Sequence, residues 1–451
     1  MNYDVIIVGG GPAGLFAAYE LITQKPELKV CLIDKGKSSK TRERSDVMCG
    51  IGGGGLFSDG KLHFTPVLSH EKLLEFYDEE EYQIFLDYVD QIFTRFGVDS
   101  DYYPKDMEKV NELVARTKKE GINLIVRKLR HVGSDKLPKV MQKFEMYLEE
   151  KGVKIYTDLQ VDQIITENNE IKGVKTVKGD LLAKYVLVAP GRIGALWIRD
   201  EAKRLGLEFS FQSIWVGVRV EFPSQIMEEF SKTMYESIFK LQSDHFDDTV
   251  RTFCPCPNGY VSKEEYDDFV FVNGHSNSHI KSDNSNFALV TKVKLTEPVS
   301  NTISYGEAIG RIANLIGGNK PILQRFRDLK NGRRSTWYRI KKSYVTPTFK
   351  DVTPGDLSMI FPARVMRNLI EGLEKLDKVM PGIASDSTLL YGPEIKFRSA
   401  KIETDKHLES KIKNLYFAGD GAGLSGNIVG AAANGIIAAK GILNKYPSKT
   451  L

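Results

Sequence analysis

Two glycine-rich segments near the N-terminus have a spacing that can bind phosphate groups. The segment "VGGGPAG" places glycines at positions 9, 11 and 14, and "GIGGGG" places them at 50, 52 and 55, so both match G-x-G-x-x-G. In this motif backbone N–H groups approach a dinucleotide pyrophosphate, which the N-terminus of the following helix also attracts. The elements on either side decide which segment performs this chemistry.

Only the first segment lies between the elements that the motif requires. Residues 3–8, "YDVIIV", form a short apolar run with β-branched side chains, which predicts a buried parallel strand. The run "LFAAYELITQ" after the glycines has helical spacing, and a second buried strand, "KVCLID", ends in Asp34, twenty residues beyond Gly14. This order predicts a dinucleotide-binding β-α-β unit.

The residues of this unit have separate roles. Gly9 permits the tight turn, Gly11 lets the pyrophosphate approach the backbone, and Gly14 lets the helix pack closely on the strand. The acid at the end of the second strand hydrogen-bonds a ribose. The predicted binding residues of this segment are Gly9, Gly11, Pro12, Ala13, Gly14, Asp34 and Lys35.

Two later segments indicate that the cofactor is FAD and that distant parts of the chain hold it. Residues 153–188 read as a β-meander that feeds a buried strand ending in Ala189-Pro190-Gly191, an insertion common in FAD-binding Rossmann domains. Near the C-terminus, "NLYFAGDGAG" reads as a strand ending in Gly419-Asp420. This resembles the G-D motif whose aspartate hydrogen-bonds the ribitol of FAD, so one FAD domain is expected to combine both ends of the chain.

Several motifs together resemble a known family. The segments "GIGGGGLFSDGKL", "HVGSDKL", "FCPCPNGYV", "DNSNFALV", "LYGPE" and "FAGDGAG" occur in the order of the uncharacterised FAD-dependent dehydrogenase family. That family is more distantly similar to the glutathione-reductase-type flavoproteins. The first motif begins at residue 8, so the small extra N-terminal domain of many members is not expected here, and "GPEIKFRS" departs from their usual pattern. The resemblance implies an FAD-dependent oxidoreductase.

The resemblance also suggests a role for the second glycine run. Residues 49–62 are expected to wrap the isoalloxazine end of FAD, and Arg42 or Arg44 either pairs with an FAD phosphate or belongs to a solvated loop. The helix after Asp420 is expected to direct its N-terminus at the flavin and to favour the anionic reduced form. The other predicted FAD-binding residues are Arg44, Gly53, Gly54, Asp59, Gly60, Lys61, Val161, Ala189, Pro190, Gly191, Gly419, Asp420, Gly426, Asn427 and Ile428.

The remaining patterns predict the domain organisation. The fold class is α/β, with a discontinuous FAD-binding Rossmann domain carrying a β-meander, a helical insertion and a mixed α+β substrate domain. Its active site is expected at the interface between domains. The predicted segments are 1–66, 151–203 and 397–451 for the FAD domain, 67–150 for the helical insertion and 204–396 for the substrate domain.

Candidate catalytic groups lie within the predicted substrate domain. His275 and His279 belong to a polar segment between two strand-like runs, and a histidine titrates near neutral pH, so either could exchange a proton beside the flavin. The alternative for this segment is an exposed polar hairpin. Cys254 and Cys256 are either a redox pair or thiols that line a pocket, and no metal site is expected because paired cysteine spacing is absent from the sequence.

The predicted reaction is hydride exchange between flavin N5 and a small organic substrate, at a CH–CH or C=C bond or else at an amine or hydroxyl carbon. The sequence shows no second β-α-β fingerprint, so NAD(P)H or a protein carrier would exchange electrons without a dedicated domain.

The composition gives no indication of a membrane or nucleic-acid protein. The net charge is only +4, no apolar run approaches a bilayer span, and four cysteines among 451 residues favour a reduced, cytoplasmic setting. The exception is "NGRRSTWYRIKKSY", 331–344, which is basic with interleaved aromatic residues. Two alternatives therefore stay open: a flavin-dependent RNA-modifying enzyme, and a non-catalytic flavin redox sensor built around the cysteines.

Overall fold

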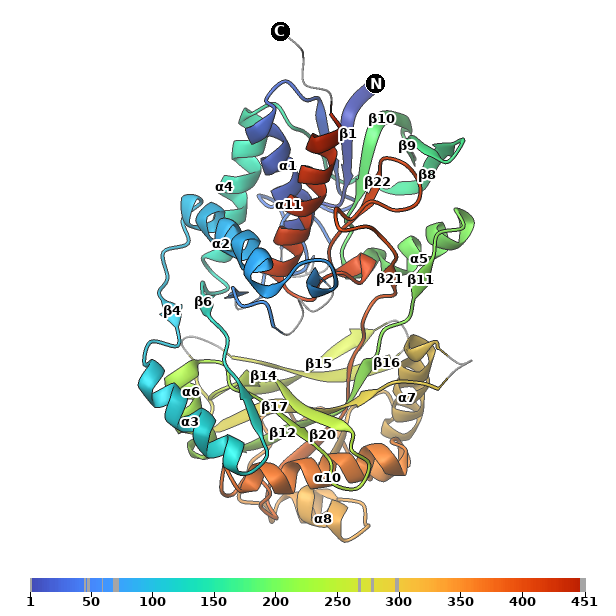
Figure 1. Cartoon of the computed structure of the whole chain (residues 1–451). Coiled ribbons are helices and arrows are strands. Elements are labelled where there is room, and N and C mark those ends of the chain that lie inside the picture. Colours follow the sequence, from blue (N-terminus) through green and yellow to red (C-terminus); the bar gives the residue numbers. More distant parts are fainter. Residues whose placement is uncertain are drawn as a thin grey trace. The chain divides into compact units, whose positions relative to one another are not determined.

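The computed structural model describes residues 2–43, 46, 49–58, 60–67, 73–266, 269–276, 280–296 and 300–446. The chain forms two compact units. Unit 1 comprises Met1–Tyr102, Lys128–Gln212 and Arg398–Leu451, and unit 2 comprises Tyr103–Arg127 and Ser213–Phe397. Figure 1 colours the chain along its sequence, so that blue and red elements both appear in unit 1.

Unit 1 is built on a sheet whose central strands are parallel, and β2, β22 and the second halves of β1 and β10 are buried. The order is β7-β2-β1-β10, and β22 lies parallel beside the second half of β10. Because both faces of such a sheet are covered, its strands are continuous apolar runs such as "VCLI" in β2. These strands are β1 (Asn2–Val8), β2 (Val30–Ile33), β7 (Lys154–Tyr156), β10 (Gly179–Val188) and β22 (Leu415–Phe417).

An antiparallel meander extends this sheet. β8 (Val161–Glu167) pairs with β9 (Glu170–Thr176), and β9 pairs with the first half of β10. The predicted fold class, an α/β chain with a discontinuous Rossmann domain and a meander, is confirmed. The small strands of this unit are β3 (Lys61–His63), β6 (Leu129–His131), β11 (Phe209–Ser210) and β21 (Lys401–Ile402), and β4 (Tyr102–Tyr103) spans its boundary.

Helices cover the sheet of unit 1, and the two central ones come from opposite ends of the chain. Figure 1 shows α1 (Pro12–Gln24) and α11 (Ile428–Lys445) side by side. They approach so closely that a Cβ on Gly435 would lie 2.0 Å from the carbonyl oxygen of Ala13. The other helices are α2 (Glu79–Arg95), α4 (Leu137–Glu150), α5 (Ala195–Arg204) and the 3-10 turns η2 (Leu73–Glu75), η3 (Arg192–Gly194) and η6 (Asp420–Ala422).

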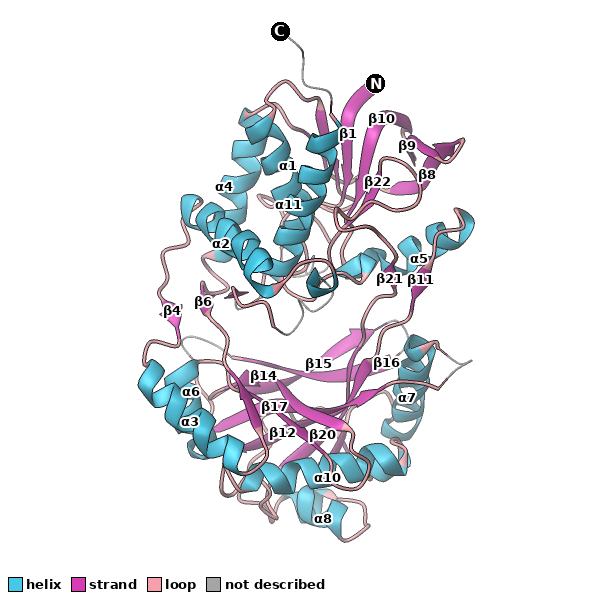
Figure 2. Cartoon of the chain, in the orientation of Figure 1, coloured by secondary structure: helices cyan, strands magenta, loops and turns pink. Residues whose placement is uncertain are grey.

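Unit 2 is an eight-stranded, mostly antiparallel sheet in the order β19-β18-β20-β12-β17-β14-β13-β5, with a separate hairpin of β15 and β16. Figure 2 shows its strands in magenta and its helices in cyan. The strands are β5 (Asn123–Ile125), β12 (Ile214–Pro223), β13 (Ile238–Gln242), β14 (Thr249–Cys256), β15 (Tyr260–Tyr266), β16 (Phe269–His275), β17 (Asn284–Val293), β18 (Ile322–Arg325), β19 (Thr353–Pro354) and β20 (Leu389–Lys396). Its helices are α3 (Met107–Lys119), α6 (Glu228–Met234), α7 (Thr302–Gly317), α8 (Phe326–Lys330), α9 (Trp337–Ile340) and α10 (Ala363–Asp377), with 3-10 turns η4 (Ser224–Met227) and η5 (Leu357–Met359).

The central strand β12 alternates between two kinds of side chain. Ile214, Val216, Val218, Val220 and Phe222 belong to the apolar core of the unit. The residues between them, which include Trp215, Arg219 and Glu221, point to the opposite face of the sheet because successive strand residues alternate. We call this second face the polar face.

The units divide the chain at positions other than the predicted boundaries. Residues 103–127, which carry α3 and β5, join unit 2, and the rest of the segment 67–150 joins unit 1. The long second piece of unit 2 runs from 213 to 397. Among the described residues, no helix is both long and apolar enough to cross a bilayer.

Candidate cofactor cradle and polar sheet face

The turn from β1 into α1 requires glycine at two positions. Gly9 has φ +106°, and a Cβ there would lie 2.2 Å from the carbonyl oxygen of Ala189. A Cβ on Gly14 would lie 1.9 Å from the carbonyl oxygen of Gly9. Both distances are far inside van der Waals contact, so these glycines let the turn, the helix and β10 meet.

The N-terminus of α1 has the properties of a pyrophosphate site. Its N-cap residue is Gly11, no side chain caps the first turn, and Pro12 occupies the first turn. Apart from its neighbours in the chain, the described residues place one atom within 4 Å of a Cβ on Gly11, the Cα of Gly53 at 3.7 Å. An uncapped helix N-terminus beside such open space can present N–H groups and a positive dipole end to an anion. The residues present therefore fit the pyrophosphate of FAD.

Asp34 lies at the end of β2 and fixes the backbone on both sides of it. Its Oδ2 accepts a hydrogen bond from the N–H of Gly10 at 2.7 Å, and its Oδ1 accepts one from Gly36 at 2.8 Å. Burial raises the pKa of Asp34, although these two bonds act in the opposite direction. A carboxylate has about four acceptor positions, so Asp34 retains capacity for a ribose hydroxyl.

The second glycine run lies against the first. Gly52 donates its N–H to the carbonyl oxygen of Gly10 at 2.8 Å, and a Cβ on Gly53 would lie 3.1 Å from the Cα of Gly11. Arg42 stabilises this run, because its Nη1 donates to the carbonyl oxygens of Gly50, Ile51 and Gly53 at 2.8–3.1 Å. We call the turn Gly9–Gly14 and Asp34 together the cradle. The second glycine run is therefore a loop beside the cradle, and the described contacts of Arg42 hold that loop in place.

The C-terminal segment completes the cradle at the same end of the sheet. β22 continues into Gly419, with φ +78°, and a Cβ on Gly421 would lie 2.3 Å from the carbonyl oxygen of Gly191. Asp420 forms an ion pair of 3.2 Å with Nε of Arg192 and accepts a hydrogen bond from Ser425. The structure thus joins the Ala189–Gly191 turn to the Gly419–Asp420 turn.

The start of α11 also lies at this end. Asn427 caps the helix, accepting the N–H of Gly430 at 2.8 Å, and a Cβ on Gly55 would lie 2.8 Å from Ile428. The predicted residues Gly53, Gly426, Asn427 and Ile428 therefore belong to elements that meet at the cradle.

Other predicted FAD-binding residues have different surroundings. Lys35 is exposed after β2, Val161 is buried and pairs with Thr176, and Lys61 pairs with His131 in the β3–β6 ladder. Gly54 is exposed within the second glycine run, and Gly60 packs beside Gly133. Arg44, Asp59 and the catalytic candidate His279 lie outside the described residues.

The polar face of unit 2 carries a buried charge cluster that no sequence motif predicted. Arg219 and Glu394 are both fully buried, with Nη1 and Oε1 3.1 Å apart. The same Oε1 lies 2.8 Å from Nζ of Lys396, and Nε of Arg219 donates to Oδ1 of Asn286 at 2.8 Å. One carboxylate thus faces two cations. The alternation of "IWVGVRVEF" contains the signal for this cluster, because a buried strand with arginine on one face needs partners there.

Aromatic side chains border this cluster. The guanidinium of Arg251 lies 4.1 Å from the ring centre of Trp215 and 4.9 Å from that of Phe253. The strand register places Arg251 and Phe253 opposite Val290 and Ala288, on the same face as Arg219. The polar face therefore combines positive charge with flat apolar surface.

The cysteines belong to the same face. Cys254 and Cys256 form no disulfide, and Arg219 Nη2 donates to the carbonyl oxygen of Cys254 at 2.8 Å and contacts Sγ of Cys256 at 3.2 Å. Cys254 has φ +44°, in a bulge of β14 opposite β17. These contacts give both residues a place in the arginine cluster.

His275 ends β16 beside this cluster. Its neighbour Gly274 contacts Arg219 directly, because a Cβ on Gly274 would lie 2.0 Å from Nη2. The ring of His275 stacks on Tyr260 with centroids 5.7 Å apart. Partial burial and the charge of Arg219 lower the pKa of His275 below its ordinary value of 6.5. The neutral imidazole therefore predominates at pH 7.

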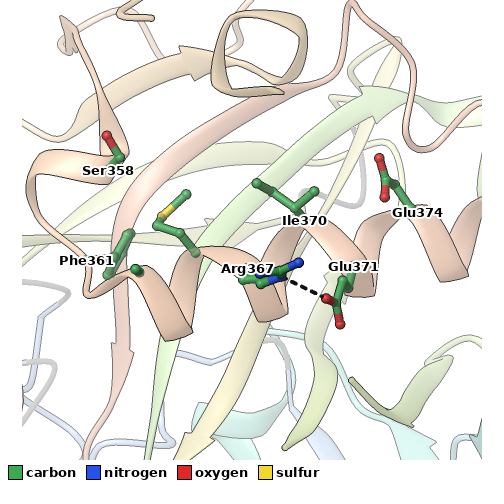
Figure 3. Close-up of a pocket in the computed structure, with 8 residues that line it drawn as sticks. Ser358, Phe361, Arg367, Ile370, Glu371 and Glu374 are labelled. Carbon is green, nitrogen blue, oxygen red and sulfur yellow. Dashed lines mark ion pairs between the residues drawn. The ribbon is translucent and has the colours of Figure 1, made fainter. Parts of the chain in front are cut away.

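A separate hollow of about 590 Å³ lies along α10. Figure 3 shows that its labelled side chains include Phe361, Ile370 and Glu374, and that Arg367 pairs with Glu371. Its lining contains neither histidine nor cysteine, so it lacks a group suited to proton transfer near neutral pH.

Comparisons with known protein families match three parts of the chain. Residues 213–397 match the model described as "FAD-dependent protein, C-terminal domain-like", which covers the long piece of unit 2. Residues 4–50 match the lycopene cyclase protein model, and residues 351–450 match the glucose inhibited division protein A model.

Individual relatives are distant. An uncharacterized protein of Clostridium beijerinckii (strain ATCC 51743 / NCIMB 8052) is 25% identical over 98% of this chain and 81% of its own length. The mitochondrial L-2-hydroxyglutarate dehydrogenase of Caenorhabditis elegans is 26% identical over 41% of this chain and 45% of its own length. A formate oxidase structure shares the fold, with a TM-score of 0.50 and 11% identity, covering 99% of this chain and 98% of that one. The match over residues 213–397 and the glycine cradle agree on an FAD-dependent protein, and the chain is similar in sequence and fold to the oxidoreductases named above.

Proposed function

We propose that the protein is a dehydrogenase that oxidises a small carboxylate at a carbon bearing a hydroxyl or amino group. The observation that carries this proposal is a cluster on the polar face of unit 2, in which Arg219 and Lys396 both pair with Glu394. Two cations around one carboxylate leave a positive charge that an anionic substrate would neutralise. Trp215 and Phe253 add a flat apolar surface for its carbon skeleton.

The distant relative supports the reaction type. L-2-hydroxyglutarate dehydrogenase, by its name, oxidises a 2-hydroxy carboxylate, and its similarity spans 200 residues. This favours a hydroxyl or amine carbon, which the sequence left open, over a CH–CH bond. FAD, when bound, supplies the hydride acceptor for such a substrate.

The residues of this chain have separate tasks in the proposal. Residues at Gly9–Gly14, Asp34 and Asp420 hold and orient the cofactor. Lys396 and Arg251 are proposed to bind the substrate carboxylate. His275 is neutral at pH 7, so it is proposed to accept the proton from the substrate hydroxyl or ammonium group as the C–H bond is oxidised.

The family, the cellular location and the electron acceptor are proposed from the sequence. The motif order supports membership of the uncharacterised FAD-dependent dehydrogenase family, and the split FAD domain with its meander is typical of the glutathione-reductase type. Few cysteines support a cytoplasmic location, and the electrons are proposed to pass to NAD(P)⁺ or a protein carrier.

The test is anaerobic bleaching of the bound flavin by panels of 2-hydroxy acids, amino acids and matched neutral alcohols and amines. We expect bleaching by carboxylates and none by their neutral amides. In Lys396→Met, KM for the carboxylate should rise about ten-fold or more, while FAD content is unchanged. Asp351→Asn, which breaks the exposed Lys320–Asp351 pair, is the control. Equal bleaching by carboxylates and neutral amides would contradict the proposal.

A further inference from the structure

Unit 2 carries three strongly exposed aromatic side chains within eight residues. Trp337, Tyr338 and Tyr344 are 43%, 70% and 96% exposed. Aromatic side chains supply much of the apolar surface that proteins bury, so a group of three on the outside indicates a binding surface. We call residues 330–344 the basic segment.

The charge of the basic segment is strongly one-sided. Lys330, Arg333, Arg334, Arg339, Lys341 and Lys342 lie within it, and no Asp or Glu occurs from 329 to 350. Arg333 is neutralised by the buried Asp328 at 2.9 Å. The chain as a whole carries only +4, so this segment concentrates more positive charge than the entire protein has in excess. Such a patch attracts a polyanion.

The segment is a built structure and not an extended tail. Ser335 is buried, donates from Oγ to Asp328 at 2.8 Å and accepts the N–H of Arg325 at 2.9 Å. Thr336 caps α9 through the N–H of Arg339, whose Nη1 donates to the carbonyl oxygen of Arg334 at 2.6 Å. The exposed rings are thus held on an ordered backbone, which reduces the entropy lost on binding.

The spacing of cations and rings suits stacked bases. Nζ of Lys342 lies over one face of the Tyr338 ring, 4.3 Å from its centre, so a charge that can meet a phosphate is held at an exposed ring. Proteins that bind single strands combine a basic track with aromatic platforms in this way. A membrane surface is less well matched, because the aliphatic residues Ile340 and Val345 are buried and cannot insert.

We propose that the basic segment binds single-stranded nucleic acid. Arg334, Lys341 and Lys342 neutralise phosphates, and bases stack on Trp337, Tyr338 and Tyr344. Nothing in this surface depends on the proposed dehydrogenase reaction. The phosphate contacts predict salt-dependent binding, because each one releases counterions and contributes about 0.7 to the slope of log K against log salt for a single strand.

The test is fluorescence anisotropy with labelled 12-mers of single-stranded RNA and DNA and a double-stranded RNA of equal length, using the FAD-loaded full chain at several salt concentrations. We expect saturable binding to single strands that weakens steeply with salt. The triple variant Arg334→Ala, Lys341→Ala, Lys342→Ala should reduce the salt slope by about two. Tyr344→Ala should weaken binding about ten-fold at constant salt slope.

The matched control is Lys118→Ala, Lys119→Ala, Lys139→Ala, which removes the same charge from exposed positions in α3 and α4. Its affinity should stay within about two-fold of the wild type. All variants should keep the wild-type FAD content and unfolding midpoint. The proposal is overturned if no oligonucleotide binds saturably at low salt, if the control weakens binding as much as the triple variant, or if anionic phosphatidylserine vesicles bind more tightly than single strands. A preference between RNA and DNA identifies which single strand is the partner.

Discussion

Arg219 and Glu394 form an ion pair of 3.1 Å in which both side chains are fully buried. Each comes from a central strand of the unit 2 sheet, β12 or β20, and Lys396 shares the carboxylate. Charges removed from water are tolerated only when they are paired and hydrogen-bonded. Removing either charge of this pair should therefore lower the free energy of unfolding of unit 2.

Replacing Glu394 by Gln should destabilise the protein strongly. The substitution keeps the shape but leaves Arg219 and Lys396 without their shared negative charge, which costs about 3–5 kcal/mol for a buried pair. Urea unfolding monitored by tryptophan fluorescence measures the change. Asp351→Asn, at an exposed pair, should change the free energy of unfolding by about 1 kcal/mol or less. Equal effects of the two variants would contradict this view of the cluster.

Gly274→Ala should disturb the same cluster without changing any charge. The added Cβ would lie 2.0 Å from Nη2 of Arg219 and 2.3 Å from Oδ1 of Asn286, so the arginine must move. We expect a loss of about 1–3 kcal/mol in the free energy of unfolding as these hydrogen bonds break. The change should be non-additive with Glu394→Gln, because both act on one network. If the losses in free energy of unfolding of the two variants add up in the double variant, the two residues do not act on one network.

Two glycines of the cradle should respond differently to alanine. Gly14→Ala places a Cβ 1.9 Å from the carbonyl oxygen of Gly9, so it should reduce the yield of folded protein as well as bound FAD. Gly11→Ala has room for its methyl group, whose nearest neighbour is 3.7 Å away, so the protein should fold. Its methyl group would enter the space assigned to the pyrophosphate. Absorbance of released FAD and the unfolding midpoint of the apoprotein separate the two outcomes, and full FAD content in Gly11→Ala would disprove the assignment.

The pH dependence of turnover should show a base with a lowered pKa. Because His275 accepts a proton in the proposed oxidation, activity is lost as pH falls and the imidazole becomes protonated. The pKa of His275 is lowered by partial burial and by Arg219, so the midpoint of the acid limb of kcat/KM should lie below 6.5. His275→Gln should lower kcat by about 10²–10⁴-fold and abolish this limb. His245→Gln, at a histidine in the segment between β13 and β14, is the control, and an unchanged limb in His275→Gln would assign the base elsewhere.

The sequence predicted the cradle in unit 1 better than the polar face of unit 2, for a physical reason. The elements around Gly9, Asp34 and Asp420 follow from local signals, since turn glycines and strand-terminal acids have fixed spacings. The FAD cofactor and the α/β fold are confirmed. Arg219, Asn286 and Glu394 come from three strands, and Arg219 and Glu394 lie 175 residues apart. Their hydrogen bonds depend on how these strands pair, which no single sequence segment predicts. The split of 67–150 between two units depends likewise on the pairing of β5 with β13.

The packing of α1 on α11 has a consequence for synthesis on the ribosome. Contacts between residues about 420 positions apart give unit 1 a high contact order, and its sheet lacks β22 until residues 415–417 have emerged. The strands of unit 2 lie within residues 123–396, so its sheet can form during translation before α11 is available to pack on α1. A chain that lacks the residues from 415 onward has neither β22 nor α11, so its nucleotide fold is incomplete and FAD can be loaded only after these residues have joined α1 and β10.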